Sequence, residues 1–133
     1  MLNPKNEYRN PKQMAEMLNN KRYDLEDRTF KFAKRAMIYV NNLPRTITNI
    51  EIGRQLSRAA GSVGANYIEA NESLGKKDFA LRIKISRKEA KESRYWVELS
   101  EPKDESADEK TFLAKEATEL MNIFGAILKK VVV

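Results

Sequence analysis

Four long stretches of the chain repeat apolar residues at steps of three and four, and no stretch alternates apolar and polar residues with a period of two. Steps of three and four place side chains on one face of an α-helix, whereas a half-buried strand needs the period of two. The stretches cover residues 24–42, 48–72, 77–99 and 109–130. The pattern therefore predicts an all-α protein without a sheet.

Capping and turn residues separate the four predicted helices. Asp24 is the expected N-cap of the first helix, and Pro44 follows its end. Thr48 and Glu51 form a T-x-x-E capping box at the start of the second helix. Because short connections make consecutive helices antiparallel neighbours, the expected architecture is an up-down-up-down four-helix bundle.

The length of 133 residues suits one compact domain. Residues 1–21 are polar and predict an N-terminal arm, in which a short helix can begin at Pro11, and we assign residues 22–133 to the bundle. No stretch has the roughly 18 to 20 apolar residues of a membrane span. Residues 1–20 also lack the apolar segment of a secretion signal. We therefore expect a cytoplasmic protein with no membrane partner.

The chain contains no His and no Cys. This excludes disulfides, thiol nucleophiles, Cys/His zinc sites and His-based acid–base catalysis. The remaining alternative is an enzyme that holds a metal with Glu69 and either Glu89 or Glu92, although bundles that bind two iron ions pair such carboxylates with His. We expect no enzyme, no catalytic residue, no metal and no cofactor.

Positive charge is concentrated in the third predicted helix of a chain whose net charge is +6. We predict nucleic-acid binding by its basic residues, which are Lys76, Lys77, Arg82, Lys84, Arg87, Lys88, Lys91 and Arg94. Lys and Arg gain free energy there by releasing counterions from phosphates. The alternative is a solvated surface with ion pairs four residues apart, such as Lys88 with Glu92. Arg94 and Glu98 are a second such pair.

The third predicted helix also carries more apolar residues than one core-facing stripe needs. Its inward positions are Phe79, Ile83, Ser86, Ala90 and Val97. Leu81, Tyr95 and Leu99 fall almost opposite them, and Trp96 falls to one side. We predict that these four residues form an interface between copies of the chain. The alternative for Tyr95 and Trp96, which follow Arg94, is stacking on a nucleic-acid base.

Polar residues share one side of the second predicted helix, beside its apolar stripe; they are Gln55, Arg58, Ser62, Asn66 and Glu69. We expect Arg58, Asn66 and Glu69 to pair with Glu89 or Glu92 of the third helix. Gly61 and Gly64 interrupt the second helix, where each glycine costs about 1 kcal/mol relative to Ala. Close packing of a neighbouring helix is the expected reason, and a functional hinge is the alternative.

Residues 55–70, QLSRAAGSVGANYIEA, resemble the Q-L-R-R-A-A-x-S-I-x-x-N-I-A-E-G motif of a bacterial four-helix bundle family first named for 23S rRNA intervening-sequence proteins. Residues 77–79 and 85–96 resemble its third helix, and the match covers about residues 24–130. The resemblance implies a homopentamer of up-down bundles. It also implies kinship with accessory proteins of diversity-generating retroelements, which are pentameric and basic and bind a reverse transcriptase and nucleic acid.

Four residues match polar positions of this family: Arg58, Asn66, Glu69 and Glu92. We interpret them as a structural polar network between helices. The chain departs from the motif at Ser57, which replaces an Arg, at Gly64, which replaces a Pro, and at Ala70, which replaces a Gly. Ser57 removes a basic group, and Gly64 should leave the second helix less kinked.

The leading hypothesis is a non-enzymatic homopentameric bundle whose basic surface binds RNA or DNA, or a nucleic-acid-handling protein such as a reverse transcriptase. The alternative hypothesis is a protein-interaction scaffold without a nucleic-acid role, in which the basic surface meets an acidic protein.

Overall fold

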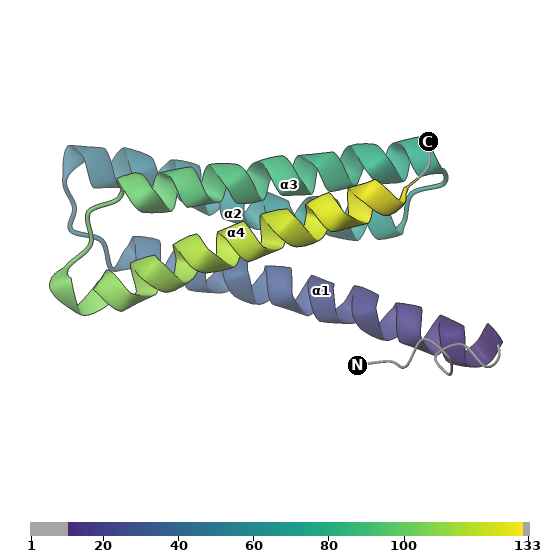
Figure 1. Ribbon diagram of the computed structural model, residues 1–133. Coiled ribbons are helices and arrows are strands. Elements are labelled where there is room, and N and C mark those ends of the chain that lie inside the picture. Colours follow the sequence, from purple (N-terminus) through teal and green to yellow (C-terminus); the bar gives the residue numbers. More distant parts are fainter. Residues whose placement is uncertain (1–10, 132–133) are drawn as a thin grey trace.

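The computed structural model describes the backbone of residues 11–131 and the side chains of residues 24–131. It contains the helices α1 (Pro11–Asn41), α2 (Ile47–Asn71), α3 (Lys76–Leu99) and α4 (Ala107–Lys130), with the short 3-10 helix η1 (Asp104–Ser106) before α4 (Figure 1). The described residues include no strand. The all-α prediction is confirmed.

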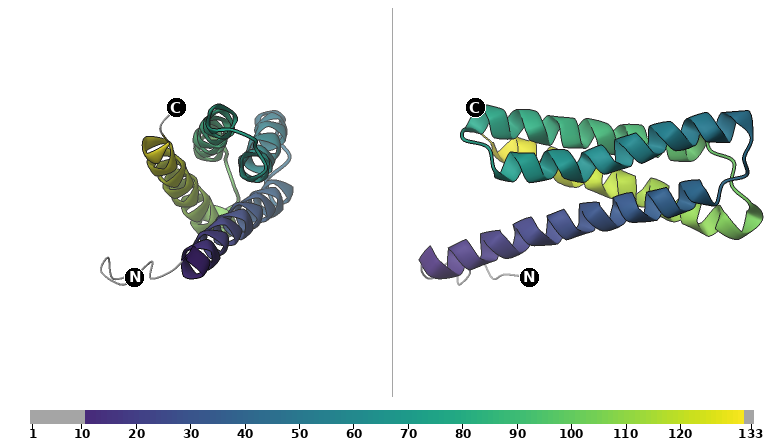
Figure 2. Two further views of the ribbon diagram at one scale, coloured as in Figure 1. Left: turned by 90° about the vertical axis from the view of Figure 1, so that its right-hand side faces the viewer. Right: turned by 180° about the vertical axis from the view of Figure 1, so that it is seen from behind.

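The helices form a bundle in chain order. Helix α3 packs most extensively, against α2 on one side and α4 on the other, whereas the contact between α1 and α4 is much smaller. Figure 1 and both views of Figure 2 show why, because α1 and α4 diverge toward the N-terminal end of α1. None of the helices in the described part of the chain is long and apolar enough to cross a membrane.

Helix α1 begins at Pro11 and continues to Asn41. The expected start at Asp24 is therefore wrong, since Asp24 lies inside the helix. A proline is well tolerated at the first helical position, where its missing N–H would have no partner. The short helix expected at Pro11 is present but is continuous with α1. Residues 1–10 lie outside the described part, and the division into an arm and a bundle stays a prediction.

Helix α2 is capped by Thr46, so the predicted capping box of Thr48 and Glu51 is wrong. The Thr46 hydroxyl accepts a hydrogen bond of 3.1 Å from the backbone N–H of Asn49. Both threonines are good caps by residue type. The choice between them follows from Asn49, whose side chain is held by tertiary contacts.

Asn49 joins the two loops at one end of the bundle. Its buried amide donates to the carbonyls of Pro44 and Glu101, at 3.0 and 2.9 Å, and its oxygen accepts from the N–H of Glu101 at 3.1 Å. Beside it, the hydroxyls of Tyr39 and Ser100 form a hydrogen bond of 2.6 Å. These contacts tie the α1–α2 turn to the α3–α4 connection.

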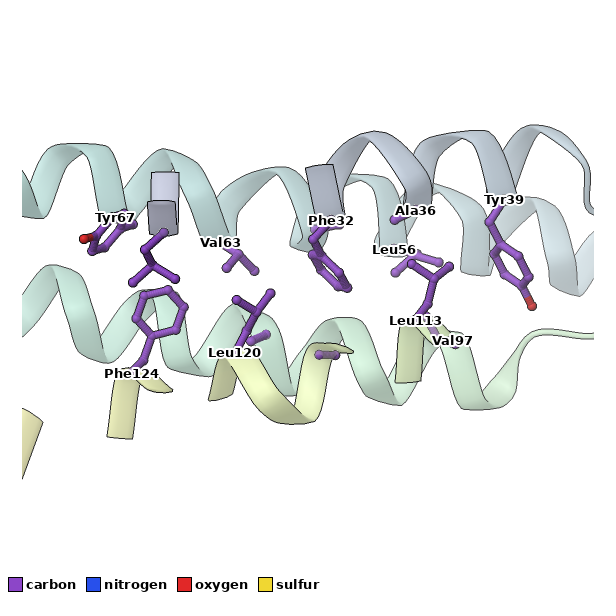
Figure 3. Packing of buried hydrophobic residues seen from close by; sticks show 14 of the residues in the cluster. Phe32, Ala36, Tyr39, Leu56, Val63, Tyr67, Val97, Leu113, Leu120 and Phe124 are labelled. Atoms are coloured by element: carbon purple, nitrogen blue, oxygen red, sulfur yellow. The ribbon is translucent and has the colours of Figure 1, made fainter. Parts of the chain in front are cut away.

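The core contains residues from every helix (Figure 3). Its large fully buried side chains include Phe32, Tyr39, Leu56, Val63, Ile83, Val97, Leu113, Leu120 and Phe124. Of the inward positions predicted for the third helix, Ile83 and Val97 are among these residues, and Ser86 and Ala90 are buried as well. Phe79 and Ile127 are only partly buried and pack against the edge of the core.

Two glycines of α2 allow α1 to approach closely. A Cβ atom on Gly64 would lie 2.9 Å from Thr29 Oγ1, and one on Gly53 would lie 2.8 Å from Val40 Cγ1. At Gly61 the nearest atom would be the flexible end of Met37, at 3.7 Å. Close packing therefore explains Gly64, whereas the space at Gly61 would accept a methyl group.

We expect Gly64→Ala and Gly61→Ala to change stability in opposite directions. Alanine in a helix gains about 1 kcal/mol over glycine, but overpacking a core costs about 1–3 kcal/mol. The Thr29 hydroxyl is buried and donates to the carbonyl of Glu26 at 3.0 Å, so it cannot move away easily. Urea unfolding should show Gly64→Ala less stable than wild type by about 1–2 kcal/mol. Gly61→Ala should be more stable by about 0.5–1 kcal/mol. Equal effects of the two variants would contradict the close approach.

Candidate nucleic-acid-binding surface on α3

The inner face of α3 is narrow, and its outer face is uncovered. Ser86, Ala90 and Ser93 are buried, and the Ser86 hydroxyl donates to the backbone carbonyl of Val63 in α2 at 3.0 Å. At about 100° per residue, the opposite side of the helix carries Lys77, Leu81, Lys84, Lys88, Lys91, Tyr95 and Leu99. All seven of these residues are exposed. We call this set the outer face of α3.

The structure divides the basic residues that the sequence predicts to bind nucleic acid. The five lysines, Lys76, Lys77, Lys84, Lys88 and Lys91, are all exposed. Arg82 and Arg94 are half-buried against the neighbouring helices, whereas Arg87 is exposed. Arg82 donates to Asn66 of α2 at 3.1 Å, and Arg94 donates to Thr118 of α4 at 3.3 Å. The guanidinium of Arg87 lies beside Gly125 of α4, where a Cβ atom would come within 3.8 Å of Nε.

The lysines of the outer face form no ion pair with any residue in the range 24–131. The predicted pair of Lys88 and Glu92 is wrong, because Glu92 instead faces Arg58 of α2 at 3.8 Å. The pair of Arg94 and Glu98 is present at 3.6 Å. The predicted ion pairing therefore holds for Arg94 and fails for Lys88, which is exposed to solvent without an ion pair in this range.

The predicted interface and the predicted nucleic-acid surface coincide on α3. Leu81, Tyr95 and Leu99 are 54%, 59% and 47% exposed and alternate with the lysines, as the helical spacing predicts. Trp96 is partly buried against the core. A second copy of the chain that covered these residues would also cover the lysines. Their role as an interface stays a prediction.

The predicted polar network between α2 and α3 forms in part. Arg58 lies 3.9 Å from Glu89 and 3.8 Å from Glu92, and Gln55 accepts a hydrogen bond from it at 3.5 Å. Asn66 contacts Arg82 rather than a carboxylate. The expected pairing of Glu69 is wrong: Glu69 is exposed and its side chain has no polar partner among residues 24–131.

Glu89 is the one buried acidic residue of this network among residues 24–131. Its Oε1 atom has no hydrogen-bond partner. Burial raises the pKa of Glu89, and the neighbouring Glu92 raises it further, while Arg58 and Lys88 act in the opposite direction. The described residues include no group of three His, Cys, Asp or Glu side chains that could hold a metal ion. Glu89 and Glu92 both lie near Arg58, whereas Glu69, which the metal alternative pairs with one of them, forms no hydrogen bond with either.

Sequence reasoning missed the contact between α1 and α4. Arg28 forms two hydrogen bonds of 2.7 Å with Glu116, and Arg35 bonds Glu109 at 2.6 and 2.9 Å. The Arg35 guanidinium also lies 3.6 Å from the ring centre of Phe112. These residues are 74 to 88 positions apart in the chain, so no local pattern pairs them. The available signal was the excess of acidic residues in the last third of the sequence.

Comparisons with known proteins found a matching family model and a similar crystal structure. The family model described as 23S rRNA-intervening sequence protein matches residues 21–126. The fold is similar to a crystal structure, at 1.70 Å resolution, of a protein with unknown function from the S23 ribosomal protein family of Bacteroides thetaiotaomicron VPI-5482. The two chains are 27% identical with a TM-score of 0.69, over 79% of this chain and 98% of that one. No curated protein matches the chain.

We expect Glu89→Gln to lose less stability than wild type when the pH rises from 4 to 7. Because the pKa of Glu89 is raised above its ordinary value of 4.5, the folded protein keeps a proton that the unfolded chain has lost. The free energy of unfolding therefore falls as the pH rises through the raised pKa. The stability advantage of Glu89→Gln over wild type should be small at pH 4 and larger at pH 7. The exposed Glu98→Gln is the matched control, and an advantage of Glu89→Gln that shrinks with pH would contradict the assignment.

Proposed function

The chain belongs to the 23S rRNA-intervening sequence protein family, and we propose that it binds RNA or DNA through the outer face of α3 without catalysing a reaction. The observation that carries the proposal is the row of Lys77, Lys84, Lys88 and Lys91, which are exposed and form no ion pair within residues 24–131. Unpaired lysines release counterions from phosphates when they bind a nucleic acid.

The length of the lysine row suits a polyanion. From Lys77 to Lys91 the helix rises about 21 Å. One strand of a duplex places a phosphate about every 3.4 Å along its axis, so several phosphates fit beside the row. A small anion would contact only one or two of these lysines.

Three basic residues of α1 have carboxylate partners, whereas the lysines on the outer face of α3 have none within residues 24–131, and this difference supports a ligand for α3. On α1, Arg28, Lys31 and Arg35 each pair with a carboxylate at 2.6–2.7 Å. The acidic residues Glu109 and Glu116 of α4 therefore compensate α1 rather than α3. Single lysines without an ion pair also occur elsewhere among residues 24–131, such as Lys34, Lys103 and Lys115, whereas four of them lie in one row on the outer face of α3.

Assembly as a homopentamer, which the resemblance implies, is part of the proposal. In a closed ring each contact joins two different faces of neighbouring copies. For the lysine row to stay accessible to a ligand, the subunit contacts must use apolar residues away from the row. Phe30 and Ile38 of α1 are such residues, being 66% and 52% exposed. A ring would repeat the lysine row and increase avidity for a long strand.

We expect the triple variant Lys84→Gln, Lys88→Gln, Lys91→Gln to bind oligonucleotides about 10- to 100-fold more weakly at 0.1 M salt. Each lost phosphate contact should lower the slope of log affinity against log salt by about 0.7–0.9. The matched control changes three exposed lysines elsewhere, Lys34, Lys103 and Lys115, to Gln. Fluorescence anisotropy with labelled RNA and DNA measures both variants, and light scattering checks that assembly is unchanged.

An equal loss of affinity in the control would show that net charge, not the outer face, determines binding. Absence of wild-type binding to RNA and DNA at low salt would reject the proposed function. The scaffold hypothesis, in which the lysines meet an acidic protein, would then remain.

A further inference from the structure

Tyr95 is an exposed aromatic residue just beyond the C-terminal end of the lysine row. It lies one helical turn after Lys91 and two turns after Lys88 on the outer face of α3. Its side chain has no hydrogen-bond partner within residues 24–131, whereas the buried Tyr39 bonds Ser100. The fold therefore makes little use of either the Tyr95 ring or its hydroxyl.

The orientation of the Tyr95 ring is restricted by Trp96. The two ring centres are 5.2 Å apart and the ring planes meet at 74°, an edge-to-face contact. Trp96 is partly buried against the core and cannot turn freely. Tyr95 is thus a supported aromatic surface that faces solvent.

Among residues 24–131, two other exposed aromatic residues have mostly paired cations beside them. Phe30 is 66% exposed; its neighbour Lys31 pairs with Asp27 at 2.7 Å, and a single lysine without an ion pair, Lys34, lies one turn further on. Phe112 is 38% exposed and is covered by Arg35, which pairs with Glu109. Tyr95, by contrast, follows lysines that form no ion pair in this part of the chain.

An aromatic ring beside free lysines matches the chemistry of an unpaired nucleotide. Base stacking on aromatic side chains is tolerant of sequence, because every base has a π-face. In a duplex these faces are stacked on each other and are not accessible. We propose that the outer face of α3 binds single-stranded nucleic acid, with one base on Tyr95 and the adjoining phosphates on Lys91, Lys88 and Lys84. This inference rests on the proposed function and specifies its ligand.

The experiment compares a single-stranded oligonucleotide without secondary structure, such as a labelled dT oligomer, with a duplex of equal length. Tyr95→Leu should weaken single-strand binding about 5- to 100-fold, the range that corresponds to loss of one base stack. Its salt slope and its duplex affinity should stay near wild-type values. Tyr95→Phe should keep wild-type affinity, because stacking does not need the hydroxyl. Phe112→Leu, which changes an exposed aromatic residue of α4 away from the outer face, is the matched control and should keep wild-type affinity.

Trp96 provides a second measurement, because it is the single tryptophan of the chain and contacts Tyr95. Its fluorescence should change when the single strand binds and stay constant when the duplex binds. In Tyr95→Leu, the Trp96 fluorescence should stay nearly constant on addition of either the single strand or the duplex.

Wild-type single-strand affinity in Tyr95→Leu would overturn the inference, as would equal losses for single strand and duplex. Dissociation of an oligomer by Tyr95→Leu would also overturn it, since Tyr95 would then lie in an interface. The proposed function survives these outcomes if the triple lysine variant still loses affinity. If wild type binds neither the single strand nor the duplex, the proposed function fails, and this inference fails with it.

Discussion

The small side chains on the inner face of α3 determine how the other helices are arranged. Ala90 and Ser93 are fully buried, and the hydroxyl of Ser86 reaches the backbone of α2. Small residues let helices approach closely, so α2 and α4 can both pack against α3. Helix α1 then packs against α2, with close approaches at Gly53 and Gly64. Nothing in the described chain covers the outer face of α3.

Helices α1 and α4 contact each other little and diverge toward the N-terminal end of α1 (Figure 2). Ion pairs join the two helices, because Arg28 and Arg35 of α1 reach carboxylates of α4. Partly exposed ion pairs contribute little stability, about 0–1 kcal/mol each. Their larger consequence is the distribution of charge, because they place acidic side chains next to α1. The lysines of α3 keep an uncompensated charge for this reason.

Helical periodicity predicts most of this fold because it records which residues face the core. The buried stripe of α4, including Leu113, Leu120 and Phe124, follows directly from steps of three and four. Periodicity carries no information about which helix end meets which loop. The hydrogen bond from the Asn49 side chain to the Glu101 carbonyl joins residues 52 positions apart. The backbone N–H of Asn49 also donates to Thr46, where α2 starts. From the sequence, the apolar residues Leu81, Tyr95 and Leu99 and the lysines of α3 have two different predicted roles, although helical spacing places them on one face, as the structure shows.

The polar network between α2 and α3 also affects the charge of the outer face. Glu92 precedes the exposed Tyr95 by three positions and follows Lys88 by four, a spacing that favours an ion pair with Lys88 within the helix. Arg58 lies within 3.8 Å of Glu92 and gives this carboxylate a partner on α2. Lys88 therefore stays unpaired within residues 24–131. A residue of α2 that contacts no ligand thus contributes to the charge of the surface that we propose binds one. Arg58 can therefore be structural and still affect the charge of that surface.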